Sequence, residues 1–129
     1  VTLKDGSDIT IIATGLMVPE ALASAEALKS QGISARVINI HTIKPIDSEI
    51  IIKAAKETGA IVTAEEHTII GGLGSAVAEV LVENSPVPMG RIGVMDKFGK
   101  SGKPAPLLKM YGLTADDITA KALETLKRK

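Results

Sequence analysis

The side chains best suited to chemistry gather in the middle of the chain, where Glu65, Glu66 and His67 precede a glycine-rich turn. The turn reads Gly71-Gly72-Leu73-Gly74-Ser75. Glycines ahead of a helix let the backbone approach another group closely, and a helix N-terminus presents free N–H groups with a partial positive charge. Such a turn can bind a phosphate, or it can pack tightly at a domain or subunit contact. No Lys or Arg lies within it, which favours the packing interpretation.

The two carboxylates and the imidazole could in principle bind a metal or transfer protons. Adjacent strand residues point to opposite faces, so we expect Glu65 and Glu66 to diverge. A single His without a second one nearby argues against zinc. We therefore favour contact roles and assign no catalytic, cofactor-binding or metal-binding residue. The candidate interface or anion contacts are Glu66, His67, Gly71, Gly72, Gly74 and Ser75.

Other motifs give weaker signals. The dinucleotide pattern G-x-G-x-x-G starts at Gly72 but fails at Val77, and no Gly-Lys-Ser/Thr follows as a P-loop would require. His41 and the basic loop around Lys97 and Lys100 are typical of surface or interface positions. No combination of nucleophile, base and acid is evident. The chain has edges that could bind a ligand, but no convincing catalytic centre.

Strand-like and helix-like segments alternate around these residues. The strands are expected at 1–4, 8–14, 33–40, 60–64 and 91–95, and the helices at 19–31, 48–59, 75–83, 106–111 and 115–127. This alternation predicts a mainly parallel sheet with helices on both faces and right-handed crossovers. Residues 1–129 form one expected domain.

Three capping signals mark the ends of these helices. Gly32 is placed to end the first, and Asp47 to cap the start of the second. Thr114 and Asp117 have the spacing of a capping box, with Asp replacing the usual Glu. These signals predict helix boundaries independently of hydrophobic periodicity.

The amino-acid composition limits the kind of core and the classes of function that this chain can have. With 45% hydrophobic residues, no Trp, one Tyr and one Phe, the core must be aliphatic. Fifteen basic and fifteen acidic residues balance, which favours neither nucleic acid nor an anionic membrane.

The absence of Cys rules out disulfides and fits a reducing, cytoplasmic location. No apolar run approaches the roughly 20 residues of a spanning helix. Because the chain starts at Val1, we expect a fragment of a longer protein.

The ordered set of motifs resembles the C-terminal domain of transketolases. The matching segments are 6–15, Lys44-Pro45-Ile46-Asp47, Glu65-Glu66-His67 with residues 71–77, residues 96–99 with Ser101-Gly102, and Tyr111-Gly112-Leu113-Thr114. Each segment alone is weak, but their order and spacing over nearly the whole chain are specific. Residues 39–45 look closest to the C-terminal section of split microbial transketolases.

The resemblance implies a three-layer α/β/α fold, with a five-stranded, mostly parallel sheet and one antiparallel edge strand, placed at residues 1–4. It also implies transfer of a two-carbon ketol unit between sugar phosphates, using thiamine diphosphate and a divalent metal such as Mg²⁺. In this family the cofactor lies between the pyrimidine-binding and diphosphate-binding domains of a dimer, and neither domain is in this chain. The domain is then expected to support dimerisation or regulation, to bind no cofactor by itself and to be inactive alone.

Two alternatives remain open. One is a stand-alone module that binds a phosphorylated metabolite at the turn of residues 72–75. The other is the C-terminal domain of a related enzyme, either deoxyxylulose-phosphate synthase or the β subunit of a pyruvate-type dehydrogenase. The upstream coding sequence would distinguish these alternatives most directly.

Overall fold

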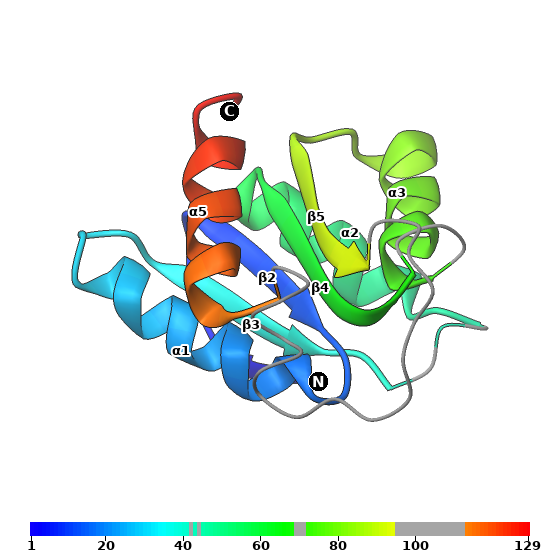
Figure 1. Ribbon diagram of the computed structural model, residues 1–129. Coiled ribbons are helices and arrows are strands. Elements are labelled where there is room, and N and C mark those ends of the chain that lie inside the picture. Colours follow the sequence, from blue (N-terminus) through cyan, green and yellow to red (C-terminus); the bar gives the residue numbers. More distant parts are fainter. Residues whose placement is uncertain (42, 44, 69–71, 95–112) are drawn as a thin grey trace.

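Five strands form one mixed sheet in the computed structural model, which describes residues 1–41, 43, 45–68, 72–94 and 113–129 (Figure 1). The strands are β1 Thr2–Lys4, β2 Ile9–Ala13, β3 Ala35–Asn39, β4 Ile61–Thr68 and β5 Met89–Val94. The described helices are α1 Met17–Lys29, α2 Ser48–Thr58, α3 Leu73–Asn84 and α5 Ala115–Leu126. The strand order is β1-β3-β2-β4-β5.

The sheet is parallel except at one edge. β2 pairs in parallel with β3 and β4, and β4 with β5, whereas β1 runs antiparallel to β3. The expectation of a mostly parallel sheet with an antiparallel edge strand at the N-terminus is therefore confirmed. Parallel neighbours need crossover connections, which the helices between the strands supply.

The helices form two layers. α1 packs against α5, and α2 against α3, and each pair covers a different face of the sheet (Figure 1). The core is divided accordingly: Ile11 and Val62 belong to one apolar cluster, and Ile12 and Ile61 to the other. All five residues of β2 are buried, as its continuous apolar run predicts for a strand covered on both faces.

The capping signals are largely confirmed. The Asp47 side chain accepts a hydrogen bond from the Ile50 N–H at 3.3 Å, and Gly59 ends α2 with a φ of 74°. At α5 the capping box forms in full between Thr114 and Asp117. Gly32 adopts a φ of 77°, but it lies two residues beyond the C-cap of α1, which is Ser30.

Several expected boundaries were wrong by a few residues. α1 begins at Met17 instead of Pro19, α3 at Leu73 instead of Ser75, and β4 continues to Thr68 instead of ending at Ala64. These three boundaries adjoin the same region at the end of β4, where long-range contacts decide the local structure. The expected loop at 96–103 and helix at 106–111 lie outside the described residues.

No helix in the described ranges is both long enough and apolar enough to span a bilayer.

Candidate functional site

The candidate site lies at the carboxyl ends of β2 and β4, where the strand order changes direction. From β2 the chain passes through α1 to β3 on one side, and it then crosses through α2 to β4 on the other. Open α/β sheets bind ligands in the crevice at such a switch point. Here Glu65 and Glu66 stand at the end of β4, beside the turn at Gly15 that follows β2.

Glu65 is completely buried and caps helix α3. Its Oε1 accepts a hydrogen bond from the Leu73 N–H at 2.8 Å, and its Oε2 accepts one from the Gly74 N–H at 2.7 Å. Both carboxylate oxygens are thus bound to N–H groups that a helix N-terminus otherwise leaves unpaired. The partial positive charge there also stabilises the buried carboxylate. This contact explains why α3 starts two residues before Ser75.

Glu66 points to the opposite face and meets the start of α1. Its Oε1 accepts a hydrogen bond from the Leu16 N–H at 3.4 Å. A Cβ added to Gly15 would lie 2.3 Å from the same oxygen, so a larger residue there would force this carboxylate to move away from Leu16. The expected divergence of Glu65 and Glu66 is therefore confirmed, because each contacts a helix on its own side of the sheet.

At the start of every described helix, a carboxylate of this chain accepts a hydrogen bond from a backbone N–H group. α1 and α3 receive Glu66 and Glu65, and α2 receives Asp47. At α5, Asp117 accepts from the Thr114 N–H at 2.9 Å, and Glu20 of α1 accepts from the Ala115 N–H at 2.9 Å. An external phosphate would have to compete with a tethered acidic side chain at each of these helix N-termini.

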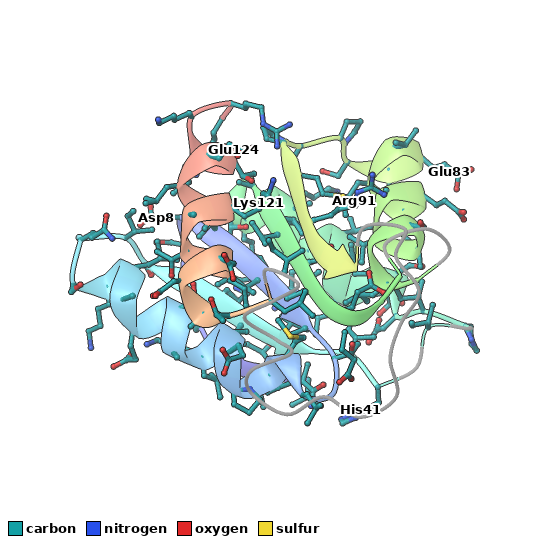
Figure 2. All side chains as sticks on the ribbon, viewed as in Figure 1. Asp8, His41, Glu83, Arg91, Lys121 and Glu124 are labelled. Atoms are coloured by element: carbon teal, nitrogen blue, oxygen red, sulfur yellow. The ribbon has the colours of Figure 1, made fainter. Side chains whose placement is uncertain are left out.

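Gly74 makes a close approach to the sheet. A Cβ at this position would lie 2.9 Å from Cδ of Arg91 and 3.1 Å from Oγ1 of Thr63. Thr63 and Arg91 are paired across β4 and β5, and Figure 2 shows Arg91 beside α3. The Thr63 hydroxyl is buried and has no hydrogen-bond partner among the described residues. A larger residue at this position would have to displace these two side chains, so Gly74 packs closely within the domain itself. Whether the turn also packs at a domain or subunit contact stays a prediction.

The remaining predicted positions are only partly described. Gly72 is the N-cap of α3, and Ser75 lies in its first turn. His67 belongs to β4, although its side chain is not described, and Gly71 lies outside the described residues. His41 is exposed, and its Nε2 lies 3.4 Å from Nδ2 of Asn39 (Figure 2). Contact roles for the candidate residues stay predictions.

Sequence reasoning missed the capping roles of three residues. Glu65 was considered as a metal ligand or a proton-transfer group, whereas its carboxylate caps the start of α3. Glu66 and Glu20 cap helices that are distant from them in the sequence. Strand alternation did separate Glu65 from Glu66. The position of a glycine-rich helix start eight residues after a strand carboxylate was the signal that could have identified the α3 cap.

The described residues do not fit thiamine diphosphate or its metal. Among them, no three His, Asp or Glu side chains are grouped closely enough to hold a metal ion. A diphosphate bound at α3 would also need the N–H groups of Leu73 and Gly74, which the buried Glu65 carboxylate already occupies. We therefore derive no catalytic step through the cofactor in this chain.

Comparison with known proteins agrees with this fold. The family model described as "Transketolase, C-terminal domain" matches residues 1–118. The 6-deoxy-6-sulfo-D-fructose transketolase subunit SqwH of Clostridium sp. (strain MSTE9) is 54% identical over 127 residues, covering 98% of this chain and 39% of the relative. A 1-deoxy-D-xylulose-5-phosphate synthase of Heliobacterium modesticaldum is 46% identical, covering 95% of this chain and 19% of that enzyme.

A solved structure extends the likeness to three dimensions. The structure titled "Split gene transketolase, inactive beta4 tetramer" superposes with a TM-score of 0.95 at 51% identity, covering 100% of this chain and 42% of that one. The fold and its capped helix starts define a three-layer α/β domain. This chain belongs to the family of transketolase C-terminal domains.

Proposed function

We propose that this chain serves as the C-terminal section of a split transketolase, an enzyme that moves a two-carbon ketol unit between sugar phosphates. It spans about two fifths of the Clostridium subunit, with 39% of that relative covered. The pyrimidine-binding and diphosphate-binding parts would then supply the thiamine diphosphate and Mg²⁺ sites. The role left to this domain is to support assembly, with the cofactor bound elsewhere.

One observation carries the structural part of this proposal. The described helix N-termini, which are the natural anion sites of an α/β fold, are occupied by the protein's own carboxylates. The buried Glu65 in particular cannot leave α3 without exposing its N–H groups and losing its own hydrogen bonds. This arrangement suits a rigid support better than a site that binds and releases phosphorylated substrates.

Names of the relatives support partnership between subunits. The Clostridium relative is a transketolase subunit, and the solved structure is described as an inactive tetramer of β chains. An inactive assembly of one kind of chain is what we expect where the catalytic site needs a second, different chain. We propose a dimer within the complete enzyme, with contacts at the carboxyl edge of the sheet near Glu66 and the turn of residues 72–75.

A domain exchange tests this role. The matching segment of the Clostridium subunit is replaced by this chain, and a second variant lacks the segment entirely. We expect the exchanged enzyme to assemble and to keep its turnover within about tenfold, equivalent to about 1.4 kcal/mol. We expect the deletion to lose assembly and activity together. A deletion that assembles and turns over normally would contradict the proposal.

A further inference from the structure

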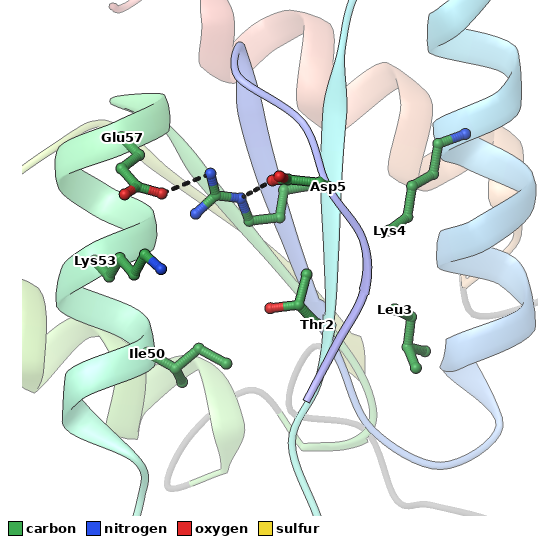
Figure 3. Close-up of a pocket in the computed structure, with 8 residues that line it drawn as sticks. Thr2, Leu3, Lys4, Asp5, Ile50, Lys53 and Glu57 are labelled. Atoms are coloured by element: carbon green, nitrogen blue, oxygen red, sulfur yellow. Dashed lines mark ion pairs between the residues drawn. The ribbon is translucent and has the colours of Figure 1, made fainter.

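A polar groove lies at the outer edge of the sheet, remote from the switch point. It has a volume of about 450 Å³ and opens between β1 and α2 (Figure 3). On this face of the sheet, α2 packs against β2 and β4, and the edge formed by β1 and β3 stays open. The volume lies within the roughly 300–1,000 Å³ range of small-molecule sites. The capping network described above does not extend to it.

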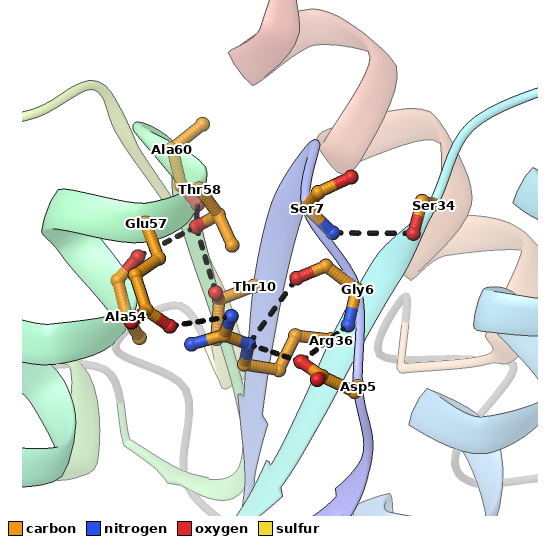
Figure 4. Close-up of polar contacts among 10 residues, drawn as sticks. All are labelled: Asp5, Gly6, Ser7, Thr10, Ser34, Arg36, Ala54, Glu57, Thr58 and Ala60. Atoms are coloured by element: carbon orange, nitrogen blue, oxygen red, sulfur yellow. Dashed lines mark hydrogen bonds and ion pairs between the residues drawn. The ribbon is translucent and has the colours of Figure 1, made fainter.

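Arg36 of β3 lines this groove and is held in a fixed orientation. Only 11% of its side chain is exposed. Its Nε lies 3.1 Å from Oδ1 of Asp5 and donates to the Gly6 carbonyl at 3.2 Å, and its Nη2 lies 2.8 Å from Oε1 of Glu57 (Figure 4). Nη1 has no partner among the described residues. A guanidinium fixed on two sides therefore has one nitrogen left to bind a ligand.

Two further donors come from other elements. Lys53 of α2 extends toward the groove, and the hydroxyl of Thr2 on β1 faces it from the opposite wall (Figure 3). Neither side chain makes a hydrogen bond or an ion pair within the described part of the chain. An oxyanion placed between α2 and β1 could accept hydrogen bonds from both of them and from Arg36.

The acidic residues of the groove restrict the ligand. Asp5 and Glu57 each use one carboxylate oxygen on Arg36 and retain a second as an acceptor. Arg36 and Lys53 together balance these two charges, and Lys4, which also lines the groove, is paired with Glu26. The groove is therefore close to neutral, and a multiply charged anion gains little. A singly charged anion that also carries hydroxyl groups would match both the donors and the acceptors.

We propose that this groove binds a small hydroxycarboxylate: its carboxylate would lie between Arg36, Lys53 and Thr2, and its hydroxyls would donate to Asp5 and Glu57. The donors come from three separate elements, and the buried guanidinium is already oriented by its two ion pairs. This preorganisation lowers the entropy cost of binding. Because the groove is open and polar, the affinity is modest.

The test is an NMR titration of the 129-residue chain with sodium D-glycerate at constant ionic strength. We expect saturable shifts in β1 and α2 with a Kd of about 1–10 mM, and at least about tenfold weaker binding of acetate, glycerol and inorganic phosphate. Lys53→Met should weaken glycerate binding about tenfold or more. The matched control is Lys56→Met, which removes the same charge from an exposed position of α2 that does not line this groove.

Three results would overturn the proposal. They are the absence of saturable shifts at about 100 mM glycerate, roughly ten times the highest expected Kd, equal losses in the two lysine variants, and equal binding of acetate and glycerate. A Thr2→Val variant provides a second check, because its position is exposed at the edge of the sheet and its loss of a hydroxyl should weaken binding without affecting the fold.

Discussion

Two neighbouring carboxylates on β4 serve opposite faces of the sheet. Glu65 is buried and accepts two short hydrogen bonds from α3, whereas Glu66 is half-buried and makes one long contact with α1. The alternation of side chains along a strand makes this division possible. The two residues therefore allow a matched comparison in which chemistry and sequence position are nearly constant, and burial and hydrogen bonding differ.

Glu65→Gln should destabilise the domain by about 1–3 kcal/mol, because one N–H of the α3 start loses its acceptor and the remaining contact loses its charge. Glu66→Gln should cost less than about 1 kcal/mol, the usual range for a helix-terminus charge at a partly exposed site. Urea unfolding of the three proteins measures both values. Equal losses in the two variants would show that the buried cap is not a special contact.

Gly15 and Gly32 permit a second residue-level test. Both have positive φ, 52° and 77°, but a Cβ at Gly15 would meet Glu66, whereas one at Gly32 has nothing within 4 Å. Gly32→Ala should cost about 1–2 kcal/mol for its backbone alone, and Gly15→Ala more. Adding Glu66→Ala to Gly15→Ala should recover the difference. Thermal melts that fail to separate the two glycine variants would argue against the close contact of Gly15 with Glu66.

At the scale of elements, local signals predicted the helices that local contacts cap. Asp47 and the Thr114–Asp117 pair lie within three residues of the N–H groups they bind, so sequence spacing identifies them. The starts of α1 and α3 were misplaced because their carboxylates come from β4, distant in the chain. β4 itself was predicted too short, since an isolated charged pair resembles the end of a strand.

The local cap of α5 gives a prediction of its own. Thr114→Ala removes the side chain that accepts from the Asp117 N–H at 3.4 Å and donates to its Oδ2 at 2.7 Å. We expect a loss of about 1 kcal/mol, the usual value of an N-cap residue. Thr114→Ser keeps the hydroxyl and serves as the control. Chemical denaturation should rank the proteins wild type, Ser, Ala; an Ala variant as stable as the wild type would exclude a contribution from the capping box.

At the scale of the whole molecule, composition and periodicity predicted the layered architecture correctly. β2 carries the near-continuous apolar run of a strand covered on both faces. The antiparallel direction of β1 came from family resemblance instead, because a three-residue strand has no period of its own. The groove beside β1 could not be predicted, since its donors converge from three elements.

The whole domain offers few unoccupied helix N-termini to an anionic cofactor within its described residues. Carboxylates of the chain itself accept hydrogen bonds from the N–H groups at its helix starts, and no metal-ligand cluster occurs in the described ranges. In thiamine-dependent enzymes the cofactor itself carries the carbanion chemistry, and the protein positions and activates it. We expect that task to belong to the parts of the enzyme that this chain does not include.

Calorimetric titration of the 129-residue chain with thiamine diphosphate and Mg²⁺ tests this account most directly. The account predicts no binding tighter than about 1 mM, equivalent to about 4 kcal/mol, because tethered carboxylates occupy the N–H groups that a diphosphate would use. The complete exchanged enzyme, titrated in parallel, should bind the cofactor and verify the reagents. Micromolar binding to the isolated chain would contradict the account and would place part of the cofactor site within these residues.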